Sequence, residues 1–300
     1  MLSPLSNSLQ RARPLLGTFV EIKITGDQSL SSDAMAAAFS TIEHVQNIMS
    51  FHDPGSDVGR INAANAGILV TVAPETYDVL QFANQLSTLS GGAFDITVAD
   101  VLVRSGFLPE HSDASPPPFR GSYQDLVLRE NHSVCWLRKG WIDLGGIAKG
   151  YAIDAAITSL KQWGIKDAVV NAGGDLRCIG SSQRIHVRHP EDDMTLIALG
   201  SLTDAAIATS AGYFSSQIED QREINPIVDP HTRRCAAWNQ SISVIASNCM
   251  TADALTKVVR LLPEGCHELL RHFNAQAISI TPQGMMTCGT TRLNEDIHEY

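Results

Sequence analysis

The sequence predicts a mixed α+β fold in one large domain. Helical and strand-like patterns both occur along its 300 residues, but they do not alternate strictly and no repeat of fixed period is present. Hydrophobic residues make up 44% of the chain, which is enough for a sizeable core and excludes wholesale disorder. This length fits one domain or two closely packed lobes. We expect an N-terminal extension over residues 1–13 and a single domain over residues 14–300.

The first elements are predicted from the spacing of apolar residues. A half-exposed strand is expected over 16–25, because apolar and polar residues alternate there. A helix capped by Ser32 or Asp33 is expected to follow. Its apolar positions recur at helical spacing and are Met35, Phe39, Ile42, Val45 and Met49. A second helix is expected to begin at Pro74 and to end at Gly91 and Gly92.

The rest of the chain mixes strands and helices. A surface loop rich in proline and glycine is expected over 105–122. Strands are expected over 125–129, 134–137, 167–171, 184–188, 195–199, 241–247 and 275–280. Helices are expected over 147–163, 251–262 and 264–273.

Charge and cysteine content exclude several classes of protein. The chain has 22 Lys and Arg against 32 Asp and Glu, a net charge of −10, so it lacks the basic surface of a nucleic-acid-binding protein. It has no run of about 18 apolar residues, so no membrane span is expected. Six scattered cysteines without a CxxC pair predict buried or half-buried thiols in a reduced setting. We expect a cytoplasmic location, or a periplasmic one if a leader precedes this sequence.

A glycine-rich turn after a strand that is expected to end at Asp143 is a candidate anion site. Gly145 and Gly146 precede a helix expected from Ile147, and Lys149 lies in its first turn. Glycine N–H groups and a helix N-terminus attract anions, and a lysine pairs with phosphate. A tight turn with a solvated lysine explains the same residues, so both interpretations stay open.

Two more segments have a functional and a purely structural interpretation. The segment 171–175 is a strand that ends in a glycine turn, where a ring or ribose could lie against bare backbone, or it is only a turn. Asp253 is expected in the first turn of a helix. There it either caps the helix or, together with the phosphates of a ligand, binds a hard cation such as Mg²⁺.

Taken together and in this order, the motifs resemble the ApbE family, the FAD:protein FMN transferases. They lie between Leu16 and Thr256 and read LGTFVEI, MSFHDPGSDVGRIN, GGAFDITV, IDLGGIAKGYAID, NAGGDLRCIG, ATSAGY, IVDPHT and TADAL. The resemblance implies a mixed α/β fold with T-fold-like character, FAD bound in a cleft and Mg²⁺ on its pyrophosphate. It also implies transfer of FMN to a Thr hydroxyl of a partner protein, with release of AMP.

The resemblance also assigns site residues by motif position. Those expected to contact FAD are Leu16, His52, Ala93, Phe94, Asp95, Asp143, Lys149, Ile227 and Thr256. The metal site is expected to use Asp253, the backbone carbonyl of Gly146 and the position of Lys257. The catalytic group is expected to be Asp253, Asp229 and His231, where His231 is either a replacement base or an ordinary surface histidine in a turn.

The chain departs from the family pattern at four of these positions. Leu16 replaces a Met and His52 a Tyr, and both changes keep an apolar or flat surface. Pro226 stands where the family has the His proposed as base. Lys257 stands where the family has a metal-binding Thr, while Thr256 comes one residue earlier. The ammonium of Lys257 either supplies part of the metal's charge or faces solvent while Thr256 supplies a hydroxyl.

Three functions are compatible with this pattern. An FAD:protein FMN transferase is the main hypothesis, and its acceptor is expected to be another protein. An Mg²⁺-dependent FAD pyrophosphatase, which uses water as acceptor, and a non-catalytic FAD-binding protein are the alternatives. A nicotinamide-binding Rossmann enzyme is disfavoured, because no GxGxxG motif follows a strand. The oligomeric state is left open.

Overall fold

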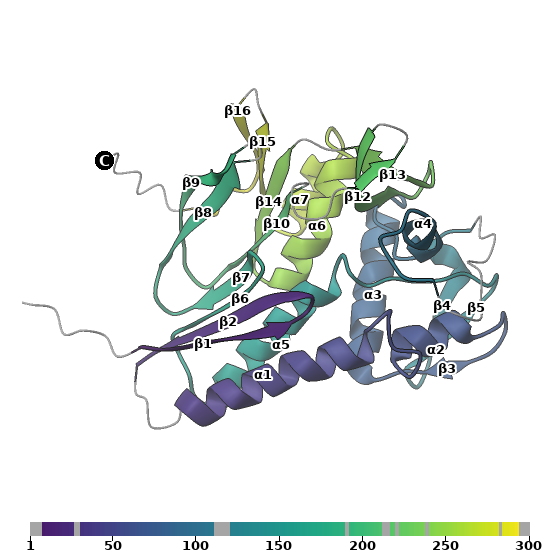
Figure 1. Ribbon diagram of the computed structural model, residues 1–300, viewed down its shortest axis with the longest axis horizontal. Coiled ribbons are helices and arrows are strands. Elements are labelled where there is room, and N and C mark those ends of the chain that lie inside the picture. Colours follow the sequence, from purple (N-terminus) through teal and green to yellow (C-terminus); the bar gives the residue numbers. More distant parts are fainter. Residues whose placement is uncertain are drawn as a thin grey trace, which may run out of the picture.

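The computed structural model describes residues 8–26, 31–110, 121–189, 192–211, 217–219, 222–237, 240–281 and 284–293. Its centre is an eight-stranded sheet in the order β1-β2-β6-β7-β10-β14-β15-β16, in which neighbouring strands are antiparallel (Figure 1). The strands are β1 (Ser8–Leu15), β2 (Thr18–Thr25), β6 (Ala168–Ala172), β7 (Asp175–Ile179), β10 (Ala206–Ala211), β14 (Ser241–Ala246), β15 (Gln276–Thr281) and β16 (Gly284–Gly289). A fold of helices and sheets was predicted, and it is confirmed.

The two faces of this sheet bury different sets of side chains. Val170 packs with the helices α1 (Ser31–Ile48), α5 (Ala148–Gln162) and α6 (Cys249–Leu261), which contact one another along one face. Its neighbour Val169 points to the opposite face, where it joins a smaller core with the hairpin β8 (Gln183–His189) and β9 (Asp192–Leu202). Alternation of side chains along a strand produces these two separate cores.

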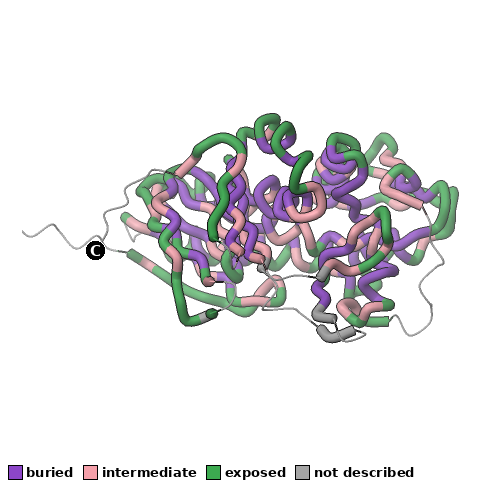
Figure 2. The backbone as a smooth tube through the Cα atoms, turned by 90° about the horizontal axis from the view of Figure 1, so that it is seen from above, coloured by how far each residue is buried: buried purple, intermediate pink, exposed green. Residues whose placement is uncertain are grey.

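The remaining elements form the other end of the molecule, on the right of Figure 1. They are α2 (Asp57–Ala63), α3 (Pro74–Leu89), α4 (Ala99–Arg104), η1 (Tyr123–Asp125), the sheet β3 (Val70–Thr71), β5 (Ser133–Trp136), β4 (Leu126–Arg129), and the sheet β11 (Gln217–Glu219), β12 (Arg222–Asp229), β13 (Arg234–Ala237). A short helix, α7 (Cys266–His272), lies between α6 and β16. Buried residues run through the interior of both ends, whereas exposed residues follow the outer turns (Figure 2).

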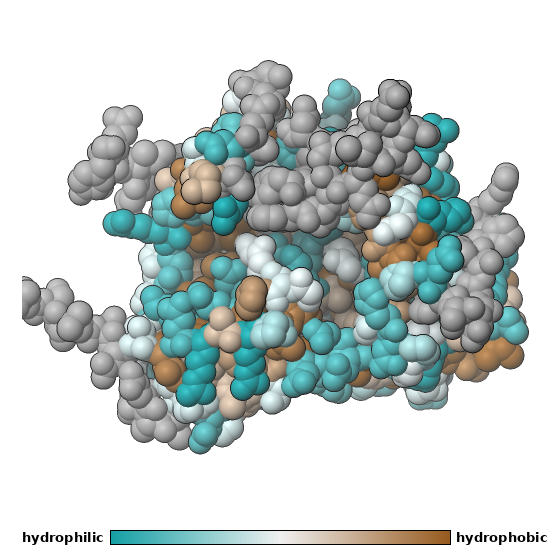
Figure 3. Space-filling model, viewed as in Figure 1, coloured by the Kyte–Doolittle hydropathy of each residue, from teal (hydrophilic) through white to brown (hydrophobic). Residues whose placement is uncertain are grey.

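The long helices follow the sequence pattern closely. Four of the five apolar positions predicted for the first helix are buried in α1, and the fifth, Met49, is buried directly after the helix ends. The polar residues of α1 form the hydrophilic lower edge seen in Figure 3. The predicted start of the second helix at Pro74 is confirmed, because this proline lies in the first turn of α3. The six cysteines are free thiols, four buried and two half-buried, as predicted. No helix within the described ranges is long and apolar enough to cross a membrane.

β1 begins at Ser8 and pairs with β2 through a two-residue turn at Leu16 and Gly17, so residues 8–13 are part of the central sheet. Two local predictions are wrong. Asp143 does not end a strand, since no strand is formed over 137–144. The helix expected at 251 begins at Cys249 instead. Of the predicted loop 105–122, residues 111–120 lie outside the described residues, as do the last two residues of the ATSAGY motif.

Candidate functional site

A pocket of about 470 Å³, open solvent included, lies where α4, α6 and β12 meet the segment that follows α3. Its wall contains seven of the predicted site residues, which come from four separate stretches of the chain: Ala93, Phe94, Asp95, Asp143, Gly146, Ile227 and Lys257. The rest of the wall is Ile96, Val98, Leu102, Pro226, Val228 and Leu261. The fold therefore brings most of the predicted cofactor-contacting and metal-site residues to one cavity.

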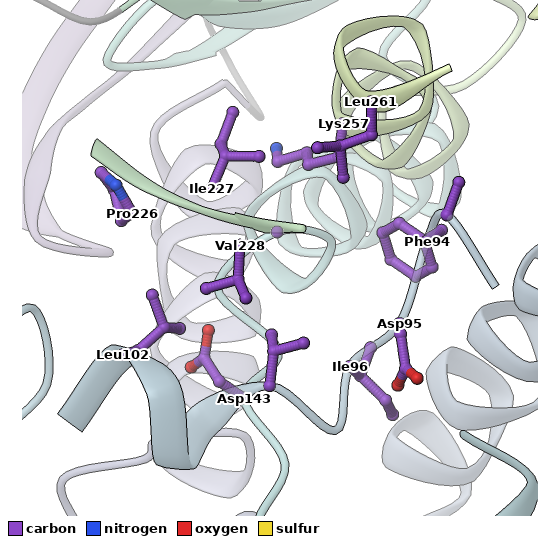
Figure 4. A pocket seen from close by; sticks show the side chains of 13 residues that line it. Phe94, Asp95, Ile96, Leu102, Asp143, Pro226, Ile227, Val228, Lys257 and Leu261 are labelled. Atoms are coloured by element: carbon purple, nitrogen blue, oxygen red, sulfur yellow. The ribbon is translucent and has the colours of Figure 1, made fainter. Parts of the chain in front are cut away.

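Lys257 extends from α6 into this pocket, and its ammonium points toward Ile227 (Figure 4). The ammonium forms an ion pair with the Asp253 carboxylate and donates to the Asp253 backbone carbonyl at 3.1 Å. Its side chain is 21% exposed, so the charge is largely shielded from water. The interpretation in which Lys257 faces solvent is therefore excluded.

Asp253 lies in the second turn of α6 rather than in the first. The helix is capped by Asn248, whose side chain accepts from the N–H of Thr251, so capping does not explain Asp253. Its carboxylate instead accepts a 3.2 Å hydrogen bond from the Gly150 N–H in α5. Burial alone raises the pKa of Asp253, but the charges of Lys257 and Lys149 outweigh it and hold the pKa below its usual value.

A second ion pair lies beside the first. Lys149, in the first turn of α5, pairs with Asp175 at the start of β7. Asp175 is only 1% exposed, and its other oxygen accepts from the Thr209 N–H at 3.0 Å. Burial lowers the pKa of Lys149, yet the charges of Asp175 and Asp253 more than compensate and raise it. We call Lys149, Asp175, Asp253 and Lys257 the charge quartet.

Asp154, to which we assigned no role from the sequence, holds α5 and α6 together. Its carboxylate pairs with Arg177 and accepts from the backbone N–H groups of Cys249 and Met250 at 2.9 and 2.8 Å. These two amides open α6, so Asp154 places this helix, and Lys257 with it, against α5. In the sequence, the one feature that could have identified Asp154 is its acidic side chain on a helix face whose other residues pack inward.

Asp95 stabilises the loop rather than reaching into the pocket. Its carboxylate accepts from the N–H and hydroxyl of Thr97, both at 2.7 Å, and from the N–H of Tyr123 at 2.9 Å. It points away from the pocket in Figure 4, and burial raises its pKa. These bonds shape the loop that presents Ala93 and Phe94, both buried, to the cavity.

Asp143 faces the pocket from the segment before α5. It accepts from the N–H of Gly145 at 3.0 Å, and burial raises its pKa above the usual 3.8 although His52 and Lys257 oppose this electrostatically. The exposed His52 is thus near Asp143 but does not line the cavity. A half-buried, ionisable carboxyl with a shifted pKa at a pocket wall is typical of a functional site.

Asp143→Asn is expected to raise the free energy of unfolding near neutral pH and to leave it unchanged below about pH 4. Because the pKa of Asp143 is raised in the folded chain, the stability contributed by its protonated form is present below 3.8 and is lost as the pH rises through the folded value. Asn does not ionise and keeps an oxygen for the Gly145 N–H. Urea unfolding over a pH series measures the difference, and a variant less stable than the parent near neutral pH contradicts this.

The other predicted residues lie outside the pocket wall. Leu16 forms the turn between β1 and β2 and donates its N–H to Gln46 at 2.6 Å. Thr256 is buried, and its hydroxyl donates to the Asp253 carbonyl at 2.7 Å. Asp229 accepts from the N–H of His231, which is exposed in the turn after β12. No role of these residues toward FAD follows from their positions.

The glycine turn at the end of β6 has a structural reason. Gly173 and Gly174 both have positive φ and connect β6 to β7. A Cβ on Gly173 would lie 2.7 Å from the Thr18 hydroxyl oxygen. The turn therefore requires glycine for close packing, and it places Asp175 at the start of β7.

The residues expected to hold Mg²⁺ do not form a suitable donor set. Of these residues only Asp253 brings a carboxylate, and one of its oxygens is paired with the Lys257 ammonium, which has no lone pair to offer. The Thr256 hydroxyl is used within its own helix. Within the described part of the chain, no group of three or more His, Cys, Asp or Glu is placed to hold a metal ion.

Comparisons with known proteins agree with this arrangement. A sequence model of the ApbE family matches residues 16–279. The "FAD:protein FMN transferase" of Vibrio cholerae is 27% identical over 268 residues, which cover 84% of this chain and 80% of that protein. The one from Escherichia coli K12 is 25% identical over 291 residues and covers 90% of this chain and 83% of that protein.

Solved structures show the same fold. The ApbE protein of Thermotoga maritima superposes with a TM-score of 0.79 at 28% identity, over 95% of this chain and 97% of that one. The flavin transferase ApbE from Vibrio cholerae gives a TM-score of 0.81 at 24% identity, over 96% and 98% of the two chains.

Proposed function

This chain belongs to the ApbE family, and we propose that it is an FAD:protein FMN transferase, an enzyme that moves FMN from FAD onto a partner protein. The observation that carries the proposal is the family match over residues 16–279. The pocket supports it, because five of the nine residues that the family motifs assign to FAD line its wall and come from distant parts of the chain. Relatives that bear this name are matched over most of their own length.

The proposed reaction is a displacement at phosphorus. The oxygen of an acceptor hydroxyl, proposed to be that of a Thr, forms a bond to the phosphorus of the FMN half of FAD. The bond from that phosphorus to the bridging oxygen breaks, and AMP leaves with the electron pair. The hydroxyl proton passes to a base or to water. Charge develops on the phosphate oxygens, so cationic groups and backbone N–H groups held in place favour the reaction.

Several groups at the pocket fit this requirement. The helix α5 begins two residues after Gly146 of the pocket wall, and the positive end of a helix favours a phosphate nearby. Lys149 and Lys257 carry ammonium groups held by buried carboxylates, so their orientation is set before a ligand binds. The apolar wall, which includes Phe94 and Ile227, suits a flat flavin ring.

The base that accepts the hydroxyl proton stays a proposal. Pro226 in the pocket wall has no group that accepts a proton. The ring of His231 is near the pocket loop, since a Cβ on Gly92 would lie 3.6 Å from its Cε1. We retain His231 as the candidate base, oriented by the turn that Asp229 stabilises. A cytoplasmic location likewise stays a prediction.

Incubation with FAD and an acceptor protein that carries a flavinylation Thr tests the function. We expect covalent flavin fluorescence on the acceptor in a denaturing gel, with one AMP released for each flavin attached. The matched control is the same acceptor with its Thr replaced by Ala, which is expected to stay dark. FMN and AMP without covalent flavin would instead identify a pyrophosphatase, and tight binding of intact FAD a binding protein.

A further inference from the structure

The charge quartet places two ammonium groups on two buried carboxylates, and its member Lys257 belongs to the pocket wall. Both carboxylates are at most 2% exposed, whereas the Lys149 and Lys257 side chains are 28% and 21% exposed. Lys257 is therefore the member of the quartet that a ligand in the pocket contacts directly. Each carboxylate also interacts electrostatically with the lysine of the other pair, so the four groups form one unit.

The stem of Lys257 lies against the glycine turn that precedes α5. Its Cε is 3.3 Å from the position that a Cβ on Gly146 would occupy, so this glycine leaves room for the lysine. The ammonium is thus held between the Gly146 turn and the Asp253 carboxylate. The family resemblance assigns Gly146 and Asp253 to a metal ion, so the ammonium of Lys257 lies where that ion is expected.

The hydrogen bonds of the ammonium leave one donor for a ligand. An ammonium has three hydrogens, and Lys257 uses two on the carboxylate and the carbonyl of Asp253. No partner for the third is present within the described ranges, and the group points into the cavity (Figure 4). A divalent ion that bound the Asp253 oxygen held by Lys257 would displace this ammonium and leave it without its carboxylate partner.

We propose that the Lys257 ammonium is the built-in cation of this pocket and binds the diphosphate of FAD in place of a divalent metal ion. The proposal rests on the proposed function, because the identity of the ligand comes from it. An ammonium carries one positive charge where Mg²⁺ carries two, so the diphosphate is less fully neutralised. Binding of FAD is consequently insensitive to chelators.

The test is a titration of the full chain with FAD, followed by quenching of flavin fluorescence, in EDTA and in Mg²⁺. For the unaltered chain, the two dissociation constants are expected to agree within about twofold. Lys257→Thr is expected to weaken binding in EDTA by about 10- to 100-fold, because a charge-assisted hydrogen bond to phosphate is lost. Mg²⁺ is expected to restore much of this loss, because the hydroxyl and the freed Asp253 carboxylate then provide metal ligands.

Two further variants make the result specific. Lys257→Met keeps the stem without a metal ligand and is expected to bind FAD weakly in both buffers. Lys161→Thr, the matched control, makes the same substitution at an exposed site in the last turn of α5 and is expected to change neither constant. Circular dichroism melting shows whether each variant is folded.

Binding of Mn²⁺, followed by electron paramagnetic resonance with FAD present, is the independent readout. We expect tight Mn²⁺ binding to Lys257→Thr and not to the unaltered chain. If EDTA abolishes FAD binding to the unaltered chain and Mg²⁺ restores it, this inference is wrong while the transferase function stands. If the Thr variant binds FAD equally well in EDTA, the inference is also wrong. No FAD binding in either buffer would overturn both.

Discussion

Lys149→Met is expected to lower the free energy of unfolding by about 3 kcal/mol and to abolish measurable FAD binding. The lysine is the ion-pair partner of Asp175, which is almost completely buried in the sheet and would be left with an uncompensated charge. Removal of one partner of a buried pair typically costs about 3–5 kcal/mol, and we take the lower end because the lysine is partly exposed. Urea unfolding and FAD titration measure the two effects.

The double variant Lys149→Met, Asp175→Asn separates the two effects. It removes both charges and keeps an oxygen that accepts from the Thr209 N–H, so most of the lost stability is expected to return. FAD binding is not expected to return, because the ammonium is still missing. A single variant as stable as the parent, or a double variant that binds FAD normally, would show that the role we give Lys149 is wrong.

Gly150→Ala is expected to destabilise the chain by about 3 kcal/mol, although alanine favours helices more than glycine does. A Cβ at this position would lie 2.7 Å from the carbonyl carbon of Cys249 and 2.8 Å from the Cα of Met250. Both are backbone atoms at the start of α6, which Asp154 holds in place, so neither moves away easily. The helix-propensity gain of about 1 kcal/mol is smaller than the cost of separating the helices.

The matched control is Gly55→Ala. Its Cβ would lie 3.3 Å from a side-chain oxygen of Asp53, which can rotate, and the position has no positive φ. We expect a change of less than about 0.5 kcal/mol there. Thermal unfolding compares the two variants, and equal melting temperatures for Gly150→Ala and the parent would contradict the close contact between α5 and α6.

Elements with a strong periodic pattern were predictable, and those without one were not. The stripe that includes Phe39 and Ile42 identifies α1, because burial of one helix face requires apolar residues at that spacing. β1 has no comparable pattern, since most of its residues are exposed on both faces of an edge strand. β10 is built mainly from small residues that pack under α6, and its sequence carries little strand signal.

The site could be predicted only in part, because the partners of its residues are distant in the sequence and no local pattern indicates them. Lys149 was placed correctly in the first turn of a helix, but its partner Asp175 is 26 residues away and belongs to a strand. Asp253 was assigned to the wrong turn, because Asn248 rather than a later residue caps α6. Asp154 carried no distinctive pattern, yet it joins α5 to α6 through bonds to residues about 95 positions further along the chain.

By itself, the sequence determined the mixed α+β class, the long helices, the family and seven of the residues that line the pocket. These follow from periodic patterns and short motifs, which are local properties of the chain. Only the tertiary structure decided what Lys257 does. Its identity as lysine allowed either a solvent-facing or a pocket-facing ammonium, and the choice depends on Asp253 within α6 and on Gly146 before α5. The packing of α5 against α6 brings these groups together and holds a fixed positive charge at the pocket.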